Sequence, residues 1–166
     1  MSFTKSNQNM EYMIAIAGDV FLQTIDNGDL VFGSEVVDLL SKIPLSVINL
    51  ETVISNNIIP KEKAFNFRIP TGKVNRLVSN GVKVVNLANN HTLDYGVEGL
   101  ISTIRTLQEV GINYFGVIQE SKQTPFIFSV DGVTIGFLGY TIGENSVDSV
   151  GIAQINEDQI KNDIIY

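Results

Sequence analysis

The chain has 166 residues and a mass of 18.2 kDa; 44% of the residues are hydrophobic and 17% are charged. This composition excludes a disordered or fibrous chain. The absence of cysteine excludes disulfides, zinc thiolates, iron–sulfur clusters and thiol catalysis. The net charge of −7 argues against a nucleic acid or an anionic membrane as partner, and it is compatible with carboxylates gathered around a cation.

The length predicts one domain. We expect a disordered lead over residues 1–10 and a single domain over residues 11–166, because the first ten residues are mostly polar. The N-terminus lacks the apolar stretch of a secretory signal. No apolar run reaches the roughly 18 residues that a membrane-spanning helix needs, so no membrane span is expected in this chain.

Secondary structure can be predicted along the chain from hydrophobic periodicity. Short apolar runs predict buried strands at 12–17, 45–50, 82–87 and 112–115. Helical spacing of apolar residues, with Ser34 and Thr71 as expected caps, predicts helices over 35–42, 71–79 and 96–109. Asp131-Gly132 predicts a hairpin between strands 126–130 and 133–138, and Asn156 is expected to cap a last helix. Residues 52–70 lack periodicity and predict a surface excursion.

The order of these elements predicts an α/β fold with a mostly parallel sheet and flanking helices. In such sheets, ligands bind beyond the carboxyl ends of the strands. Three polar clusters follow three of the predicted strands, namely Gly18-Asp19, Asn49 to Glu51, and Asn89 to His91. We therefore expect the side-chain oxygens of these clusters to converge on one edge of the sheet.

Each carboxylate has two interpretations. Asp19 could be a ligand for a hard cation or a turn former after Gly18. Glu51 directly follows a buried strand and needs a partner, which could be a cation or one of three basic residues. These residues are Lys61, Lys63 and Arg68.

The run from Asn89 to Asp94 is the densest polar cluster, and it contains the only histidine in the chain. An asparagine carbonyl can ligate a metal, His91 can donate a proton or hold an anionic oxygen, and Asp94 can orient the imidazole. The alternative is a loop whose asparagines bond the backbone and whose Asp94 caps the next helix. With Asp19 and Glu51 on the same edge, the functional interpretation is favoured.

Two further residues are weaker candidates. Arg68 lies among aromatic residues and could bind a phosphate or a carboxylate, although an exposed ion pair explains it as well. Tyr140 ends the second strand of the hairpin and is expected to pack rather than react. The sequence has no glycine-rich phosphate loop and no serine nucleophile elbow.

Together these residues resemble a known family. Five segments carry the resemblance: Ala17-Gly18-Asp19-Val20, Ile48-Asn49-Leu50-Glu51-Thr52, Phe67-Arg68-Ile69-Pro70, the run from Asn86 to Gly96 (NLANNHTLDYG), and Gly136-Phe137-Leu138-Gly139-Tyr140. In this order they resemble the capsule-synthesis CapA family of bacteria, which is associated with poly-γ-glutamate capsule and related to calcineurin-like metallophosphoesterases. The resemblance runs from about residue 13 to about residue 155.

The resemblance implies roles for individual residues. Asp19 matches the first metal carboxylate, Glu51 matches the bridging carboxylate, and Asn90 matches the metal-ligating asparagine. His91 matches the neighbour of that asparagine that assists the leaving oxygen, while Asp94 matches the pattern without an assigned role. The implied cofactor is Mn²⁺ or Mg²⁺, because oxygen ligands suit hard cations.

This sequence also departs from the family. Phosphoesterases usually have a histidine two residues after the first aspartate, where this chain has Phe21. The later histidine segments of the family, similar to His-Trp-Gly and Gly-His-x-Pro-His, are not in this sequence. The chain is therefore expected to be the N-terminal half of a metallophosphoesterase-like sandwich, with the other half or an oligomer partner completing it.

Two functions from different classes follow. The first is a metal-dependent phosphoesterase-like hydrolase, incomplete in this chain, with His91 near the leaving oxygen of a phosphate ester. The second is a non-catalytic factor that binds the capsule polymer during assembly or export. The expected partner is an anionic polymer or a phosphate-containing small molecule, and the family suggests association with the cell envelope.

Overall fold

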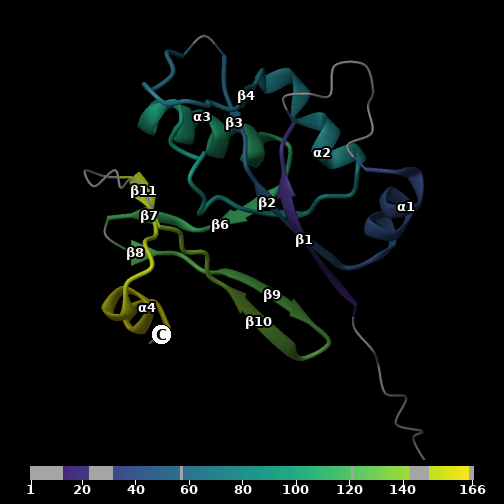
Figure 1. Ribbon diagram of the computed structural model, residues 1–166. Helices are drawn as coiled ribbons and strands as arrows, with labels where there is room; N and C mark the ends of the chain where they lie inside the picture. Colours follow the sequence, from purple (N-terminus) through teal and green to yellow (C-terminus); the bar gives the residue numbers. More distant parts are fainter. Residues whose placement is uncertain (1–12, 23–31, 57, 121, 143–149, 165–166) are drawn as a thin grey trace, which may run out of the picture.

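The central element is a parallel four-stranded sheet with the order β1-β2-β5-β6. The computed structural model describes residues 13–22, 32–56, 58–120, 122–142 and 150–164 (Figure 1). The four strands of the sheet are β1 (Ile14–Val20), β2 (Leu45–Leu50), β5 (Val84–Asn86) and β6 (Asn113–Phe115). The prediction of an α/β fold with a parallel sheet is confirmed.

The helices occur where periodicity predicts them. They are α1 (Ser34–Lys42), α2 (Asn75–Ser79), α3 (Gly96–Glu109) and α4 (Glu157–Ile164), with a short 3₁₀ turn, η1 (Thr71–Lys73), before α2. Asn156 caps α4 as expected, since its Oδ1 accepts the backbone N–H groups of Asp158 and Gln159 at 2.9 and 3.2 Å. The expected caps Ser34 and Thr71 are wrong: α1 begins after Gly33 and η1 after Pro70, and neither has a side-chain cap.

One face of the sheet forms the main core. Side chains alternate across strands, so Ile48 and Leu50 of β2 and Val85 of β5 point to the same side. There they pack in one cluster with apolar residues of α2 and α3, which include Leu77, Leu100, Ile104 and Leu107. The helices therefore cover this face of the sheet (Figure 1).

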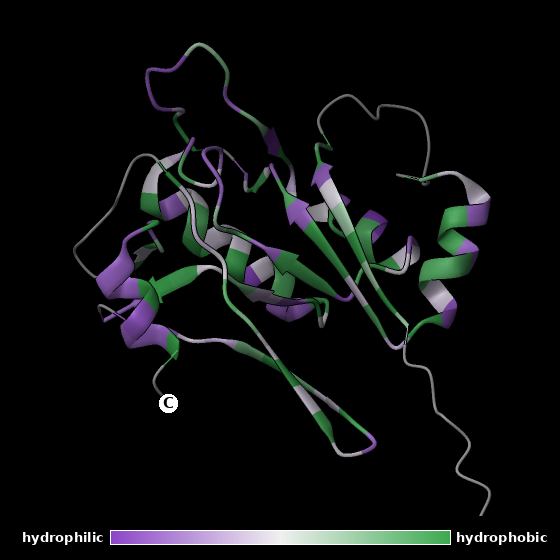
Figure 2. Cartoon of the chain, turned by 60° about the horizontal axis from the view of Figure 1, so that its bottom comes forward, coloured by the Kyte–Doolittle hydropathy of each residue, from purple (hydrophilic) through white to green (hydrophobic). Residues whose placement is uncertain are grey.

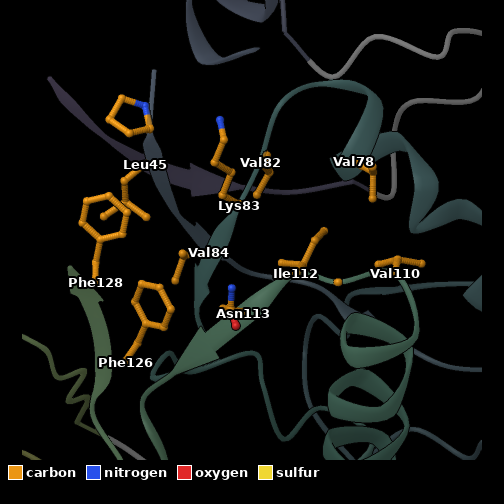
Figure 3. Close-up of a pocket in the computed structure, with 12 residues that line it drawn as sticks. Leu45, Val78, Val82, Lys83, Val84, Val110, Ile112, Asn113, Phe126 and Phe128 are labelled. Atoms are coloured by element: carbon orange, nitrogen blue, oxygen red, sulfur yellow. The ribbon is translucent and has the colours of Figure 1, made fainter. Parts of the chain in front are cut away.

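The opposite face of the sheet packs against a hairpin. Its two strands are β9 (Phe126–Val130) and β10 (Val133–Phe137), joined by Asp131-Gly132, which both have positive φ angles. Both strands of the hairpin contain several apolar residues (Figure 2). Phe126 and Phe128 pack against Leu45 and Val84 of the sheet. These four residues help to line a mainly apolar pocket of about 290 Å³ (Figure 3). The predicted hairpin is confirmed.

The prediction of a buried first strand is wrong for most of β1. Residues 16–19 are exposed, and Ile16 retains 73% of its accessible surface. The physical reason is that β1 is an edge strand, which pairs only with β2 within the described part of the chain. Tyr12, where the predicted strand began, lies outside the described residues.

The excursion over residues 52–70 contains one short pairing that the sequence did not predict. Strand β3 (Val53–Ile54) pairs in parallel with β4 (Arg68–Ile69). Another unpredicted sheet has three strands, β7 (Val117–Gln119), β8 (Lys122–Gln123) and β11 (Val150–Ile152). None of the helices in the described ranges is both long and apolar enough to cross a membrane.

Candidate functional site

Asp19 reaches the site because β1 contains a β-bulge. Ile16 pairs with Val47, and Asp19 pairs with Asn49, so three steps along β1 match two steps along β2. The extra residue reverses the alternation of side chains and places Asp19 on the same face as Asn49. The Asn49 Nδ2 donates a hydrogen bond of 2.7 Å to the Asp19 Oδ1.

Asn49 is the centre of an amide ladder across the carboxyl end of the sheet. Its Nδ2 also lies 3.4 Å from the Glu51 Oε1, so one amide group bridges two carboxylates. Its Oδ1 accepts hydrogen bonds from Asn86 at 3.1 Å and from Asn89 at 3.2 Å. Both hydrogen-bonding atoms of the Asn49 amide are thus engaged, which fixes the side chain between the strands and the loop after β5.

Glu51 lies in an environment that opposes its negative charge. Partial burial is the largest cause that raises the pKa of Glu51, and the neighbouring Asp19 carboxylate raises it further. His91 and the hydrogen bond from Asn49 act in the opposite direction. Because burial and Asp19 outweigh the effects of His91 and Asn49, a positive charge placed beside the two carboxylates would stabilise the ionised form of Glu51.

The two neighbouring asparagines have different surroundings. Asn89 is buried; its Nδ2 donates to the Leu50 carbonyl at 2.9 Å, and its Oδ1 accepts the His91 N–H at 3.0 Å. Asn90 is exposed, and its backbone carbonyl accepts a hydrogen bond of 2.9 Å from the Lys63 ammonium. Asn89 therefore fits the expectation of a loop asparagine that bonds the backbone, while the Asn90 side chain lies at the surface beside His91.

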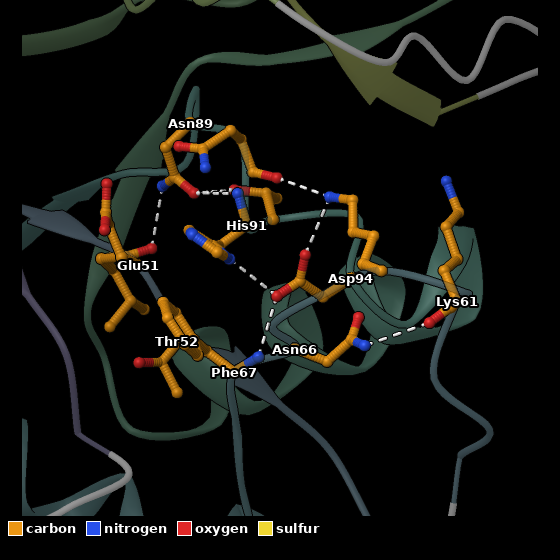
Figure 4. A network of polar contacts seen from close by, with 12 residues as sticks. Glu51, Thr52, Lys61, Asn66, Phe67, Asn89, His91 and Asp94 are labelled. Carbon is orange, nitrogen blue, oxygen red and sulfur yellow. Dashed lines mark hydrogen bonds and ion pairs between the residues drawn. The ribbon is translucent and has the colours of Figure 1, made fainter.

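His91 and Asp94 form a dyad. The His91 Nδ1 lies 2.9 Å from the Asp94 Oδ2, and Figure 4 shows the imidazole between Asp94 and Glu51. An ionised carboxylate only accepts hydrogen bonds, so this contact requires a proton on Nδ1. The second nitrogen, Nε2, is then left to accept or deliver a proton.

Asp94 is fully buried, and its carboxylate contacts two other groups besides His91. Its Oδ2 also accepts the Phe67 backbone N–H at 2.8 Å, and its Oδ1 forms an ion pair of 3.0 Å with Lys63. The alternative role of Asp94 as a helix cap is wrong, because α3 has no side-chain cap. Lys63, one of the expected partners of Glu51, therefore pairs with Asp94.

Arg68 is placed differently from the residues around His91. Its guanidinium donates a hydrogen bond of 2.8 Å to the Ser55 carbonyl, and its Cζ lies 5.6 Å from the centre of the Tyr95 ring. Among the described residues, no ion pair joins Arg68 to Glu51. The structure thus brings Asp19, Glu51, His91 and Asp94 into one cluster and places Arg68 in a separate set of contacts.

Sequence analysis did not assign roles to Asn49 and Asn86. They are cross-strand partners at the carboxyl ends of β2 and β5, and a repeated asparagine at the end of two apolar runs was the available signal. Gly116 and Gly139 make room for the Asn86 side chain, since a Cβ at either position would collide with the Asn86 Oδ1. The position of the Asn86 side chain therefore explains why both residues are glycine.

Tyr140 belongs to a second polar cluster away from the dyad. Its hydroxyl donates to the Asp163 Oδ2 at 3.0 Å, and Gln123 and Gln159 also donate to this carboxylate. Burial, followed by the hydrogen bond and the charge of Asp163, raises the pKa of Tyr140 to about 12. The contacts hold α4 to the rest of the molecule, which is a packing role.

The donor set can be tested for its fit to a cation. Carboxylate and amide oxygens suit Mg²⁺ or Mn²⁺, and Asp19 and Glu51 repel each other across one shared amide. Within the described ranges, however, no group of three or more histidine, cysteine, aspartate and glutamate side chains is placed to hold a metal. The part of such a donor set that the structure places together is therefore the pair of carboxylates of Asp19 and Glu51.

The fold and this edge of the sheet define an α/β protein with acidic and histidine-containing loops after parallel strands. The family model of the bacterial capsule synthesis protein PGA_cap matches residues 13–164. The chain therefore belongs to this family, and the resemblance to the CapA family is confirmed.

Curated relatives show the same similarity over parts of the chain. The uncharacterized protein y4sH of Sinorhizobium fredii (strain NBRC 101917 / NGR234) is 34% identical over 118 residues, which cover 67% of this chain and 25% of that protein. The capsule biosynthesis protein CapA of Bacillus anthracis is 40% identical over 63 residues, 37% of this chain and 15% of that protein. The PGA biosynthesis protein CapA of Bacillus subtilis (strain 168) is 36% identical over 61 residues, 35% of this chain and 16% of that protein.

The chain matches only part of the length of each of these relatives. The chain spans about a quarter of the length of the Sinorhizobium protein, and the matches to the two Bacillus proteins cover still less of each. Family membership is a property of these 166 residues.

Proposed function

We propose that this member of the capsule synthesis family has a divalent-cation site of the phosphoesterase type, held by Asp19, Glu51 and Asn90. The convergence of Asp19 and Glu51 on the single amide of Asn49 is the observation that carries the proposal. Two carboxylates from separate strands repel each other, and a cation would relieve that repulsion. Mn²⁺ or Mg²⁺ is the expected ion because the ligands are oxygens.

The residues of the chain have distinct tasks in this proposal. Asn49 fixes the two carboxylates relative to each other through its hydrogen bonds to both. Asp94 accepts the proton on the His91 Nδ1, so Nε2 can take up a second proton, and in the imidazolium form it could donate that proton to a leaving oxygen. A bound cation would supply Lewis-acid polarisation of a phosphate or related ester.

The substrate class follows from charge. A divalent cation attracts an anionic group, whereas the protein itself carries a net charge of −7. The candidate ligands are a phosphate ester and an anionic capsule polymer such as poly-γ-glutamate. The second is suggested by the name of the Bacillus subtilis relative, a PGA biosynthesis protein.

A second function is a binding factor without catalysis. Within the described ranges, no third histidine or carboxylate joins Asp19 and Glu51 in a group placed to hold a metal, and this favours the binding factor. Two-metal hydrolysis stabilises both the attacking and the leaving oxygens, and this requires more ligands than these residues provide. A single cation could still bridge the protein to a polymer carboxylate.

Isothermal titration calorimetry with Mn²⁺ and Mg²⁺ tests the metal site. We expect weak binding to the 166-residue chain and loss of most of the heat in Asp19→Ala. Asp38→Ala is a matched control, because Asp38 is an exposed aspartate of α1 that pairs with Lys42. Equal heats for the wild type and Asp19→Ala would reject Asp19 as a ligand.

Two assays separate the candidate functions. A phosphoesterase requires metal-dependent turnover of an aryl phosphate that is lost in His91→Ala. A binding factor requires Mn²⁺-dependent retention of poly-γ-glutamate that survives His91→Ala but is lost in Asp19→Ala. If neither turnover nor retention occurs, the proposed site has no function in this chain.

A further inference from the structure

Both backbone polar groups of Phe67 are hydrogen-bonded. Its N–H donates to the buried Asp94 Oδ2 at 2.8 Å, and its carbonyl accepts the Val53 N–H at 3.0 Å, beside the pairing of β3 and β4. The first of these bonds uses the same carboxylate oxygen that contacts the His91 Nδ1. Phe67 and His91 are thus attached to a common point, as Figure 4 shows.

The side chain of Phe67 makes a second, independent contact with His91. The two rings are stacked with their centroids 4.0 Å apart and an interplanar angle of 23°. Phe21 lies against Phe67 as well, with ring centroids 4.1 Å apart. The imidazole is therefore held by a hydrogen bond to Asp94 and by the face of an aromatic ring.

Lys63 completes the restraint on Asp94. Its ammonium bonds the Asp94 Oδ1 and also the Asn90 carbonyl. Asp94 then has a cation on one oxygen and two N–H donors on the other, so its carboxylate cannot rotate without breaking at least one of these partly buried contacts. The orientation of His91 depends on this carboxylate.

We propose that Phe67 is a positioning residue for His91: its ring holds the imidazole with Nδ1 against the Asp94 carboxylate, and this orientation favours the tautomer with the proton on Nδ1. This inference deepens the proposed function and rests on it only for the use to which Nε2 is put. The proposal also gives a role to Phe21, which occupies the position where phosphoesterases usually have a histidine. Its ring supports the ring of Phe67.

Simple core packing is the competing explanation. It predicts that replacing Phe67 lowers stability and leaves the tautomer of His91 unchanged. Positioning predicts a change in the histidine itself. The two explanations can be separated because His91 is the only histidine, so its ring gives a single set of nuclear magnetic resonance signals.

The experiment records imidazole ¹⁵N and ¹H signals of the labelled 166-residue chain without metal at pH about 8, above the ordinary histidine pKa of about 6.5. The wild type should show a protonated Nδ1, an unprotonated Nε2, and ring protons displaced upfield by Phe67. In Phe67→Leu, the two nitrogen shifts should move toward each other and the upfield displacement should be lost. Phe67→Tyr should preserve both signatures.

Phe65→Leu is the matched control, since Phe65 belongs to the same segment and is 71% exposed. It should leave the His91 signals unchanged. A folded Phe67→Leu with wild-type signals would overturn the proposal. A wild-type spectrum with the proton on Nε2 would also overturn it, and this measurement needs no variant. Because neither metal nor substrate is used, a failure of the proposed phosphoesterase or binding function is distinguishable from a failure of this inference.

Discussion

The change Asn49→Asp tests the acidic centre most directly. It preserves the size of the side chain and an oxygen that can accept from Asn86 and Asn89, but it removes the Nδ2 donor. A carboxylate oxygen then stands where nitrogen now lies 2.7 Å from the Asp19 Oδ1 and 3.4 Å from the Glu51 Oε1. We expect the free energy of unfolding to fall, because two attractive contacts become repulsive.

The magnitude follows from the exposure of the two partners. Two unit charges 4 Å apart interact with about 1 kcal/mol in water and about 4 kcal/mol at an effective dielectric constant of 20. The repulsion between the new carboxylate and the exposed Asp19 should be near the lower value. The repulsion from the partly buried Glu51 should lie between the two values. With the lost hydrogen bonds included, the change should cost about 2–4 kcal/mol in chelator, or about 5–12 °C in Tm.

Denaturant unfolding in chelator and in Mn²⁺ gives the measurement. Asn49→Asp should lose stability in chelator and recover part of it with Mn²⁺, to a greater extent than the wild type gains. The deficit should also shrink as the pH falls through about 4, where carboxylates take up protons. Asn113→Asp, at an exposed position of β6, is the control. An Asn49→Asp variant as stable as the wild type in chelator would refute the interpretation of Asn49 as a bridge between carboxylates.

Three further predictions concern stability and activity. Gly139→Ala should destabilise the fold by about 1–3 kcal/mol in thermal unfolding, because its Cβ collides with the Asn86 Oδ1, whereas Gly136→Ala meets only the end of a flexible side chain at 3.4 Å. Burial and Asp163 raise the pKa of Tyr140 to about 12, so the unfolded chain loses this proton first. The free energy of unfolding should therefore fall from pH about 10 to about 12, and less so in Tyr140→Phe. The 166-residue chain alone should show little or no turnover of an aryl phosphate.

Much of the fold could be predicted because it depends on local patterns. The bounds predicted for the helix over 96–109 and the strand over 45–50 are those of α3 and β2. The convergence of Asp19 and Glu51 could be predicted as well, since parallel strands present their carboxyl ends at one edge. Neither of these features depends on contacts between distant side chains.

The remaining features depend on such contacts. The exposure of β1 follows from its place at the edge of the sheet, and an apolar run does not reveal the order of strands. The bulge that turns Asp19 toward Asn49 is a matter of register. The segment over residues 61–68 has no periodicity, yet through Lys63 and Phe67 it holds the loop that carries His91.

The rigidity of the site has a source outside the site itself. Gln123 is buried, and its Oε1 accepts the N–H groups of Gly116 and Gly139, the two glycines that pack on Asn86. Asn86 in turn donates to Asn49, which bridges the carboxylates. A hydrogen-bonded and close-packed path therefore links the three-stranded sheet to the acidic edge. Since neither glycine leaves room for a Cβ beside the Asn86 amide, packing restrains Asn86 and, through its hydrogen bond to Asn49, the amide that contacts both carboxylates.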